Sequence, residues 1–242
     1  MDACKLGLSA MLAAMLGACG GGGGQNSTGS GTSYAYVPPV QNSARVYAET
    51  VVDNSNNTIN IGFSQIVQAV NADGSIAEIE QSTTGSSAIV NGANYAIQTE
   101  TQIYNAQGQE TSYVDLSDSP NLSCSLDPHG AGPNWPVQVG QTWSLDYTLT
   151  CGTSVSVAYT QSGSVAGVES VTVPAGTFTA VKLQTTISWT SAGGTIRKQT
   201  TTNWRDVATS HSVKQSVTIT VSGTLPTAGY AVSREIELQS TS

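Results

Sequence analysis

Two histidines, His129 and His211, are the first residues to consider for catalysis or metal binding. They share neither an H-E-x-x-H pattern nor any other i, i+4 spacing, so no zinc site is predicted. Serines are abundant, but none lies in a G-x-S-x-G segment, the turn that exposes a nucleophilic serine. No glycine-rich loop is placed to hold a phosphate. The sequence therefore predicts no catalytic residue, no cofactor and no enzyme.

Two groups of acidic and amide side chains could offer oxygen ligands to calcium. The first is Asp53 with its neighbouring asparagines, whose spacing departs from that of an EF-hand and lacks the closing glutamate. A polar turn is the favoured interpretation there. Asp115, Asp118 and Asp127 form the better calcium candidate, but their pattern is not specific either. We predict no metal site.

The N-terminal segment carries the most specific signal. An apolar run from Leu6 to Ala18 follows Lys5 and is 13 residues long, shorter than the roughly 20 that a membrane-spanning helix needs. It is typical of a secretory signal peptide over residues 1–18. The run ends in Leu16-Gly17-Ala18-Cys19, which resembles the lipobox of bacterial lipoproteins. The resemblance implies that Cys19 receives a lipid, including palmitate, and that the chain is cut before it.

The same resemblance implies a location. Bacterial lipoproteins with Asp after the lipidated cysteine stay in the inner membrane, whereas Gly20 and Gly21 follow Cys19 here. The outer membrane is the expected destination, with the domain on its periplasmic face or at the cell surface. Residues 20–43 are rich in Gly, Ser, Thr and Asn, a composition that does not fold by itself. We predict a flexible lipidated tether over residues 19–43, with a reach of about 25–30 Å.

Two cysteines remain once Cys4 leaves with the signal peptide and Cys19 is acylated. Cys124 and Cys151 lack the C-x-x-C spacing of redox or metal sites. In an exported protein, an even number of remaining cysteines predicts a disulfide. This disulfide would contribute roughly 3–4 kcal/mol to stability on the chain-entropy model.

The chain is acidic, with a formal net charge of −8, so nucleic acid is not an expected partner. The charges are segregated. Between residues 44 and 181 Arg45 is the only base against twelve acids, whereas residues 182–242 hold six bases and three acids. Two interpretations stay open. The charges lie on solvated strand faces, or the last third forms a basic groove for an anionic ligand.

Alternating apolar and polar residues predict strands along nearly the whole folded part. Trp143, Leu145, Tyr147 and Leu149 share one parity, and similar runs continue to Leu238. Pairs such as Asn91-Gly92 and Gly193-Gly194 mark hairpin turns between them. No convincing helical stripe appears, which excludes parallel α/β folds. The predicted fold is an all-β antiparallel meander that forms a half-barrel, barrel or sandwich, over residues 44–242, with two candidate sub-halves at about 44–120 and 136–242.

Three spaced segments in the second half carry a further resemblance. They are Pro136–Trp143, the run Val171–Lys182 that begins Val171-Thr172-Val173-Pro174-Ala175-Gly176-Thr177-Phe178, and Trp204-Arg205 with Val213-Lys214. Together they resemble a family of poorly characterised bacterial envelope proteins. Some members are similar to half-barrels that carry lipids or lipoproteins across the periplasm. Arg205 stands where the family has an aromatic residue.

Trp204 is the tryptophan least explained by core packing, because Thr200 and Thr202 of the same parity are polar. Beside Arg197, Lys198 and Arg205 it forms our candidate ligand surface, although packing at a core or rim also accounts for it. The expected function is that of a membrane-anchored envelope lipoprotein with a binding or structural role and an unknown lipid or protein ligand. Two alternatives stay open: a half-barrel carrier of a lipid or acyl chain, and a hydrolase with an unrecognised site.

Overall fold

The computed structural model describes residues 31–83, 89–90, 92–95, 97–117, 120–130, 132–153 and 155–242. These residues form strands, turns and loops but no helix, and hence no helix long and apolar enough to cross a membrane. The predicted signal peptide, Cys19 and the first part of the tether lie outside the described residues.

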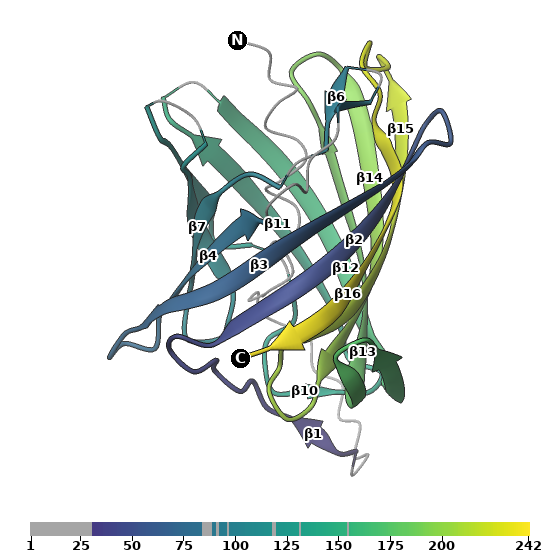
Figure 1. Cartoon of the computed structure of the whole chain (residues 1–242). Helices are drawn as coiled ribbons and strands as arrows, with labels where there is room; N and C mark the ends of the chain where they lie inside the picture. The colour runs from purple at the N-terminus through teal and green to yellow at the C-terminus, as the bar shows by residue number, and fades with distance from the viewer. Residues whose placement is uncertain are drawn as a thin grey trace.

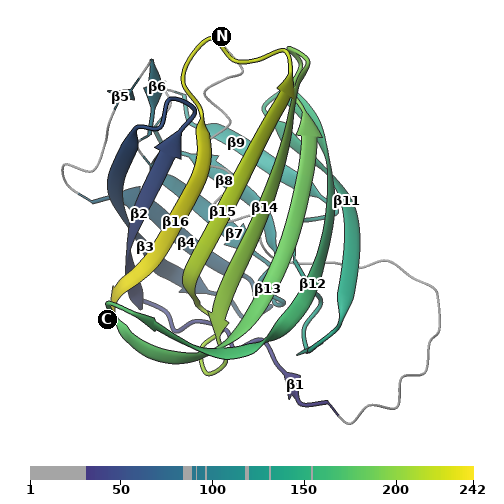
Figure 2. The ribbon, with the colours of Figure 1, turned by 90° about the vertical axis from the view of Figure 1, so that its right-hand side faces the viewer.

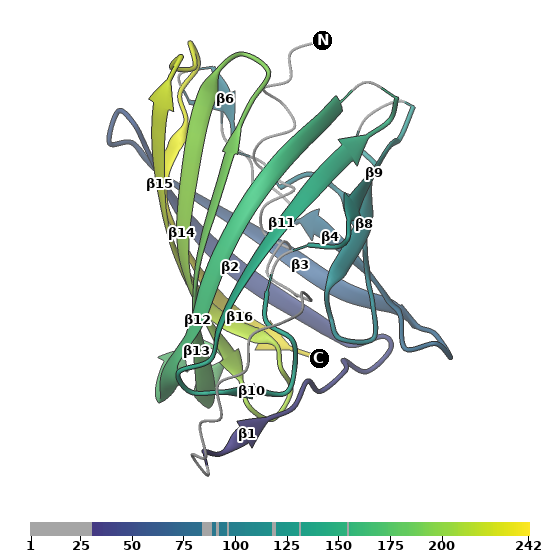
Figure 3. The ribbon, with the colours of Figure 1, turned by 180° about the vertical axis from the view of Figure 1, so that it is seen from behind.

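Twelve antiparallel strands of the described chain form one closed barrel (Figures 1 and 3). They are β2 (Ala44–Asp53), β3 (Thr58–Val70), β4 (Ile76–Ser82), β7 (Glu100–Tyr104), β8 (Glu110–Asp115), β9 (Leu122–Asp127), β11 (Thr142–Cys151), β12 (Val155–Val173), β13 (Gly176–Thr190), β14 (Thr195–Asp206), β15 (Ser212–Gly223) and β16 (Ala231–Thr241). Two short pairs lie outside the barrel sheet: β1 (Ser33–Tyr34) with β10 (Val137–Gln138), and β5 (Ile89–Val90) with β6 (Ala93–Asn94).

The barrel strands follow one another in chain order, the circle closes at a first seam between the last and first strands, and a second seam joins the two halves of the meander. At the first seam β16 pairs with β2, and Ala44 and Ser242 exchange backbone hydrogen bonds. At the second seam β9 pairs with β11. The all-β antiparallel prediction is confirmed, and of its three forms the structure adopts the closed barrel. The segments 44–120 and 136–242 both contribute strands to this single barrel.

Glycines at predicted turns allow the tight hairpins that a meander needs. Gly74 and Gly194 adopt φ of 83° and 79° in the turns before β4 and β14. This left-handed region is open to glycine without steric cost. These turns set the register of their hairpins.

The alternation of buried and exposed positions is as predicted, but the buried face is not uniformly apolar. In β2 the buried positions are Arg45, Tyr47, Glu49, Val51 and Asp53. In β4 and β7 they include Glu78, Glu80, Glu100 and Gln102. Barrel closure explains this, because it shields the inner face from solvent whatever the polarity of the side chains on it. The part of the barrel interior that β2, β4 and β7 line is therefore polar.

An N-terminal segment that we call the strap, residues 33–43, crosses one end of the barrel. Its β1 pairs with β10, and Tyr34 and Tyr36 pack against a cluster that contains Trp135 and Val137. Residues 33–43 of the predicted tether therefore lie against the barrel, with Tyr34 and Tyr36 partly buried there.

The hairpin of β12 and β13 extends past the barrel end. Figure 2 shows it curving toward the C-terminal strand, and Ala175 donates a backbone hydrogen bond to the carbonyl of Leu238 in β16. Val171 and Val173 of this hairpin are buried against the cluster that contains Val213. The motif V-x-V-P-A-G-x-F thus forms a hairpin that covers neighbouring strands.

Candidate functional site

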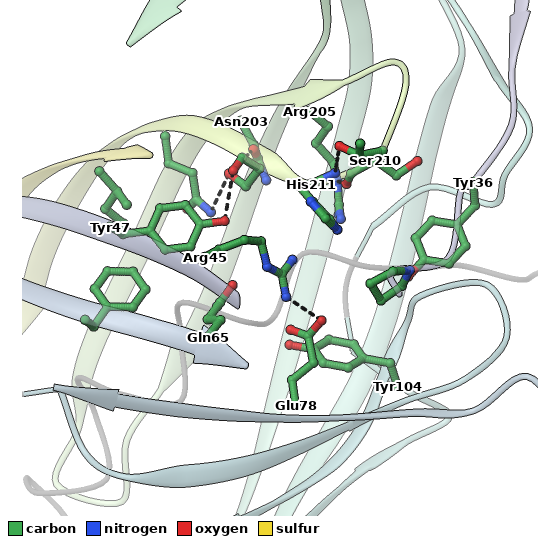
Figure 4. Close-up of a pocket in the computed structure, with 16 residues that line it drawn as sticks. Tyr36, Arg45, Tyr47, Gln65, Glu78, Tyr104, Asn203, Arg205, Ser210 and His211 are labelled. Atoms are coloured by element: carbon green, nitrogen blue, oxygen red, sulfur yellow. Dashed lines mark hydrogen bonds and ion pairs between the residues drawn. The ribbon is translucent and has the colours of Figure 1, made fainter. Parts of the chain in front are cut away.

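A small cavity lies inside the barrel at the end that the strap covers (Figure 4). Its volume is about 60 Å³, enough for a few water molecules or one compact chemical group. Its lining is mostly polar: Tyr36, Pro39, Arg45, Tyr47, Phe63, Gln65, Glu78, Tyr104, Asn203, Arg205, Thr209, Ser210, His211, Ser212, Gln215 and Ile236.

Strand register brings these residues together from distant parts of the sequence. Arg45 of β2 lies opposite Gln65 of β3, and Asn203 of β14 lies opposite Gln215 of β15. All four side chains are on the inner face, since they share the parity of buried neighbours in their strands. The two pairs come from the first and last parts of the barrel, which the β16–β2 seam makes adjacent.

The turn between β14 and β15 forms the rim of the cavity. Ser210 has a positive φ of 57° and its amide donates to the carbonyl of Asp206 at 2.8 Å. Thr209 donates its hydroxyl to the Asp206 carboxylate at 2.7 Å. The strap contacts this turn, because the amide of Val37 donates to Oγ of Ser210 at 2.9 Å. The turn and the strap are thereby fixed to each other.

Arg45 and Glu78 form a buried ion pair within the cavity, at 2.5 Å between Nη2 and Oε1. Both side chains are less than a tenth exposed. Nε of Arg45 is buried without a hydrogen-bond partner. The positive charge of Arg45 is therefore balanced by a carboxylate, while one of its donors is not used.

Arg205 differs from the other buried arginines of the described chain. Arg45 pairs with Glu78 and Arg234 pairs with Glu49, but Arg205 has no carboxylate partner among the described residues. It is 8% exposed, and its Nε donates to the carbonyl of Ser210 at 2.6 Å. Burial lowers the pKa of Arg205, and the charge of Arg45 lowers it further. A guanidinium nevertheless stays protonated in proteins, so the charge is buried and not neutralised.

The ring of His211 faces the same two arginines. Burial and the charges of Arg45 and Arg205 lower the pKa of His211 to about 3, so the ring is neutral at physiological pH. Its Nε2 is buried and has no hydrogen-bond partner. Burial also raises the pKa of the lining residue Tyr36 to about 12, which keeps its hydroxyl protonated. The cavity thus carries one net positive charge, from two arginines and one glutamate.

No serine of the described chain is activated by either histidine. Beside His211, Oγ of Ser210 accepts from Val37 and Oγ of Ser212 donates to Asn203 at 2.8 Å. Nδ1 of His129 lies 3.2 Å from the carbonyl of Gly130. A hydrolytic serine needs a hydrogen bond from its hydroxyl to a basic ring nitrogen.

A second polar cluster lies deeper on the inner face. Glu80, Glu100 and Asp115 occupy cross-strand positions in register on β4, β7 and β8. Burial is the main cause that raises the pKa of Glu80 and of Glu110 well above the usual range, and it raises the pKa of Glu100 to about 7. Within the described residues no three such groups are arranged to hold a metal ion.

The four residues of the predicted ligand surface do not form one surface. Arg205 lies in the cavity, and Arg197 occupies another inward-facing position of β14. Trp204 and Lys198 occupy outward-facing positions of the same strand. The Trp204 indole donates to Oε1 of Glu169 at 2.5 Å, and Nζ of Lys182 lies 5.2 Å from the Trp204 ring centroid. The prediction grouped neighbours in sequence, but alternation along a strand separates them.

The other predicted residues lie as follows. Cys124 and Cys151 form a disulfide that joins β9 and β11 at the second barrel seam. Asp53 accepts two backbone amides, from Ser55 and Asn57, in the polar turn that its sequence favoured. Asp115 accepts the amide of Ser117 at 2.8 Å, while Asp118 lies outside the described residues.

Of the three motif segments, only the last contributes a residue, Arg205, to the cavity lining. The amide of Gly140 donates to the carbonyl of Val165, and Val181 and Lys182 lie opposite Arg205 and Trp204. Sequence reasoning missed Arg45, Glu78 and Tyr36 as site residues. A usable signal was present, because Arg45 and Glu78 share strand parity with apolar residues such as Tyr47 and Ile76.

Comparison with known proteins identifies the fold. No family model and no curated protein matches the chain. Two solved structures are similar: a "putative exported protein with YmcC-like fold" from Bacteroides fragilis and a "putative lipoprotein" from Parabacteroides distasonis. The first has 11% identity and a TM-score of 0.51, the second 13% and 0.50. In each case the match covers 86% of this chain and 99% of the other, so the chain shares the fold of these two proteins.

Proposed function

We propose that this chain is an envelope lipoprotein, anchored to the outer membrane through an acylated Cys19, whose barrel binds a ligand and catalyses no reaction. The observation that carries the binding role is the buried cavity, which holds one uncompensated positive charge and one ring nitrogen without a hydrogen bond. The Arg205 guanidinium has no carboxylate partner among the described residues, and Nε2 of His211 has no hydrogen bond. Buried polar groups of this kind cost stability unless something satisfies them, and a bound ligand does so.

The lipid anchor rests on the sequence. Leu16-Gly17-Ala18-Cys19 follows a short apolar run, and glycines follow the cysteine. The two proteins of the same fold are described as exported and as a lipoprotein, which supports a location in the envelope. The strap, which follows the predicted anchor in sequence, lies at the cavity end of the barrel.

Labelling with radioactive palmitate in bacterial cells tests the anchor. Cys19→Ser should abolish incorporation, because the acylated thiol is gone, while Cys4→Ser should keep it. Equal labelling of the two variants would refute the anchor.

Native mass spectrometry of the full chain released from detergent tests the binding role. A retained small polar molecule is expected, in an amount that falls in Arg205→Gln and is unchanged in Lys198→Gln. A barrel that is empty in every preparation would contradict a binding role.

A carrier of an acyl chain has less support. An acyl chain needs an apolar concave surface, whereas the cavity is lined by Arg45, Glu78 and Arg205 and the barrel is closed. The apolar inner side chains Leu145, Tyr147 and Trp189 pack with one another in a core cluster. Retention of a phospholipid in the native mass spectrum would favour the carrier instead.

A further inference from the structure

We infer that the cavity is a site for a compact oxyanion, a carboxylate or a phosphate group, with Arg205 as its principal partner. This inference rests on the proposed binding role and names the chemical class of the ligand. It follows from the charge balance of the cavity, from the donors that are free there, and from its size.

The charge balance is positive. Within the cavity Glu78 neutralises Arg45, and no second carboxylate of the described chain neutralises Arg205. The lining tyrosines do not contribute negative charge, because burial raises the pKa of Tyr36, Tyr47 and Tyr104. A guanidinium in a site shielded from water requires a counter-charge, and an anion supplies it.

The donors converge on one small space. Arg205 uses its Nε for the carbonyl of Ser210, which leaves its two terminal amino groups for a planar or tetrahedral oxyanion. Nε of Arg45 and Nε2 of His211 are buried and have no partners. The ring of His211 is neutral, so in one tautomer its Nε2 carries a proton and donates. Donors from three side chains surround the cavity, and Figure 4 shows Arg205 and His211 side by side above Arg45.

The size of the cavity restricts the group it holds. A volume of about 60 Å³ admits a carboxylate or a phosphate head but not a large molecule as a whole. Thr209, exposed in the turn between β14 and β15, lies at the rim, where a larger molecule would continue outward. The shared chemistry is therefore an oxyanionic group, either free in solution or carried by a lipid head group.

The test uses the full chain in detergent with His129→Gln, which leaves His211 as its only histidine. Acetate and inorganic phosphate are titrated at constant ionic strength against chloride, with acetamide as the neutral analogue of acetate. Saturable shifts of the His211 ring resonances are expected with the two anions and not with acetamide. The pKa of His211 should rise when an anion is bound, because the anion offsets the charges of Arg45 and Arg205.

Variants separate a built site from surface charge. Arg205→Gln should weaken anion binding about tenfold or more, as expected when a charge-assisted contact is lost. Lys198→Gln removes the same charge from the outer face and should leave binding unchanged. Should Arg205→Gln fail to fold, His211→Gln serves instead, because the His211 ring nitrogen Nε2 has no partner to lose. Its binding, measured by calorimetry, should fall several-fold.

The outcomes are distinct. Equal losses in Arg205→Gln and Lys198→Gln, or shifts with acetamide as large as with acetate, would overturn the oxyanion site. A neutral molecule retained in native mass spectra, without any response to anions, would overturn this inference and leave the proposed binding role intact. No response and an empty barrel would overturn both. Displacement of phosphate by short-chain phosphatidate would assign the group to a lipid head, and its absence would assign it to a free solute.

Discussion

Glu80 of β4 and Glu100 of β7 lie directly opposite each other on the inner face of the barrel, and both are almost fully buried. Two carboxyl groups in this position do not both ionise at low cost, because burial and mutual repulsion disfavour the charged forms. Burial raises the pKa of Glu100 to about 7, against 4.5 for an ordinary glutamate. The barrel interior is therefore sensitive to pH.

Glu100→Gln should stabilise the protein increasingly as the pH rises from about 4.5 to 7. In this range the folded state holds a proton on Glu100 that the unfolded chain has released, so the wild type loses stability with rising pH. The variant lacks this loss, and the difference in unfolding free energy between the variant and the wild type should level off above about pH 7. Urea denaturation at a series of pH values measures it.

Two features make this experiment specific. Glu235→Gln changes an exposed glutamate of β16 and should follow the wild-type profile. His211 acts in the opposite direction, because its pKa falls from 6.5 to about 3 on folding and stability falls as the pH drops below 6.5. A Glu100→Gln curve parallel to that of the wild type would refute the prediction.

Removal of Arg234 should destabilise the barrel strongly. Arg234 forms an ion pair with Glu49, and the two side chains are 5% and 0% exposed. Arg234→Met leaves a buried carboxylate without its partner, which costs roughly 3–5 kcal/mol of unfolding free energy. The double variant Glu49→Gln with Arg234→Met should recover much of this loss. Lys214→Met, which breaks the more exposed pair with Glu237, should cost about 1 kcal/mol or less. A similar loss in Lys214→Met and Arg234→Met would contradict the argument.

The disulfide should stabilise the seam between β9 and β11. Cys124 and Cys151 are cross-strand partners separated by 27 residues in sequence. Replacing both with alanine should lower the free energy of unfolding by about 2–5 kcal/mol, because the unfolded chain gains freedom. Equilibrium denaturation with and without reductant measures the change. Reductant should destabilise the wild type and not the double variant, and a wild type insensitive to reductant would argue against the linkage.

Gly163 should not tolerate a side chain. A Cβ at this position of β12 would lie 2.2 Å from an atom of the Trp143 ring. Gly163→Ala should therefore displace the indole and destabilise the protein by about 1–3 kcal/mol. Gly167 of the same strand has open space around its Cβ position, so Gly167→Ala is the matched control and should have little effect. Tryptophan fluorescence and urea denaturation report both changes, and equal stability of the two variants would disprove the contact.

Local patterns in the sequence determined the fold class. Period-two alternation and Asx-Gly or Gly-Gly turns act between near neighbours, so they predict hairpins without knowledge of the rest of the chain. The even number of cysteines after processing predicted the disulfide for a similar reason, since it depends on count and compartment only. The lipid anchor at Cys19 also comes from the sequence alone and stays a prediction.

The tertiary structure decided what the inner face contains. Arg45 and Arg205 are 160 positions apart, and only the pairing of β16 with β2 makes them line one cavity. Sequence neighbours were misleading here, because Trp204 and Arg205 point to opposite faces of β14. Closure of the barrel also buries glutamates that the alternation of the sequence alone would leave partly exposed to solvent. The distant pairing of strands, which no local pattern encodes, thus determined where the candidate site lies and which side chains line it.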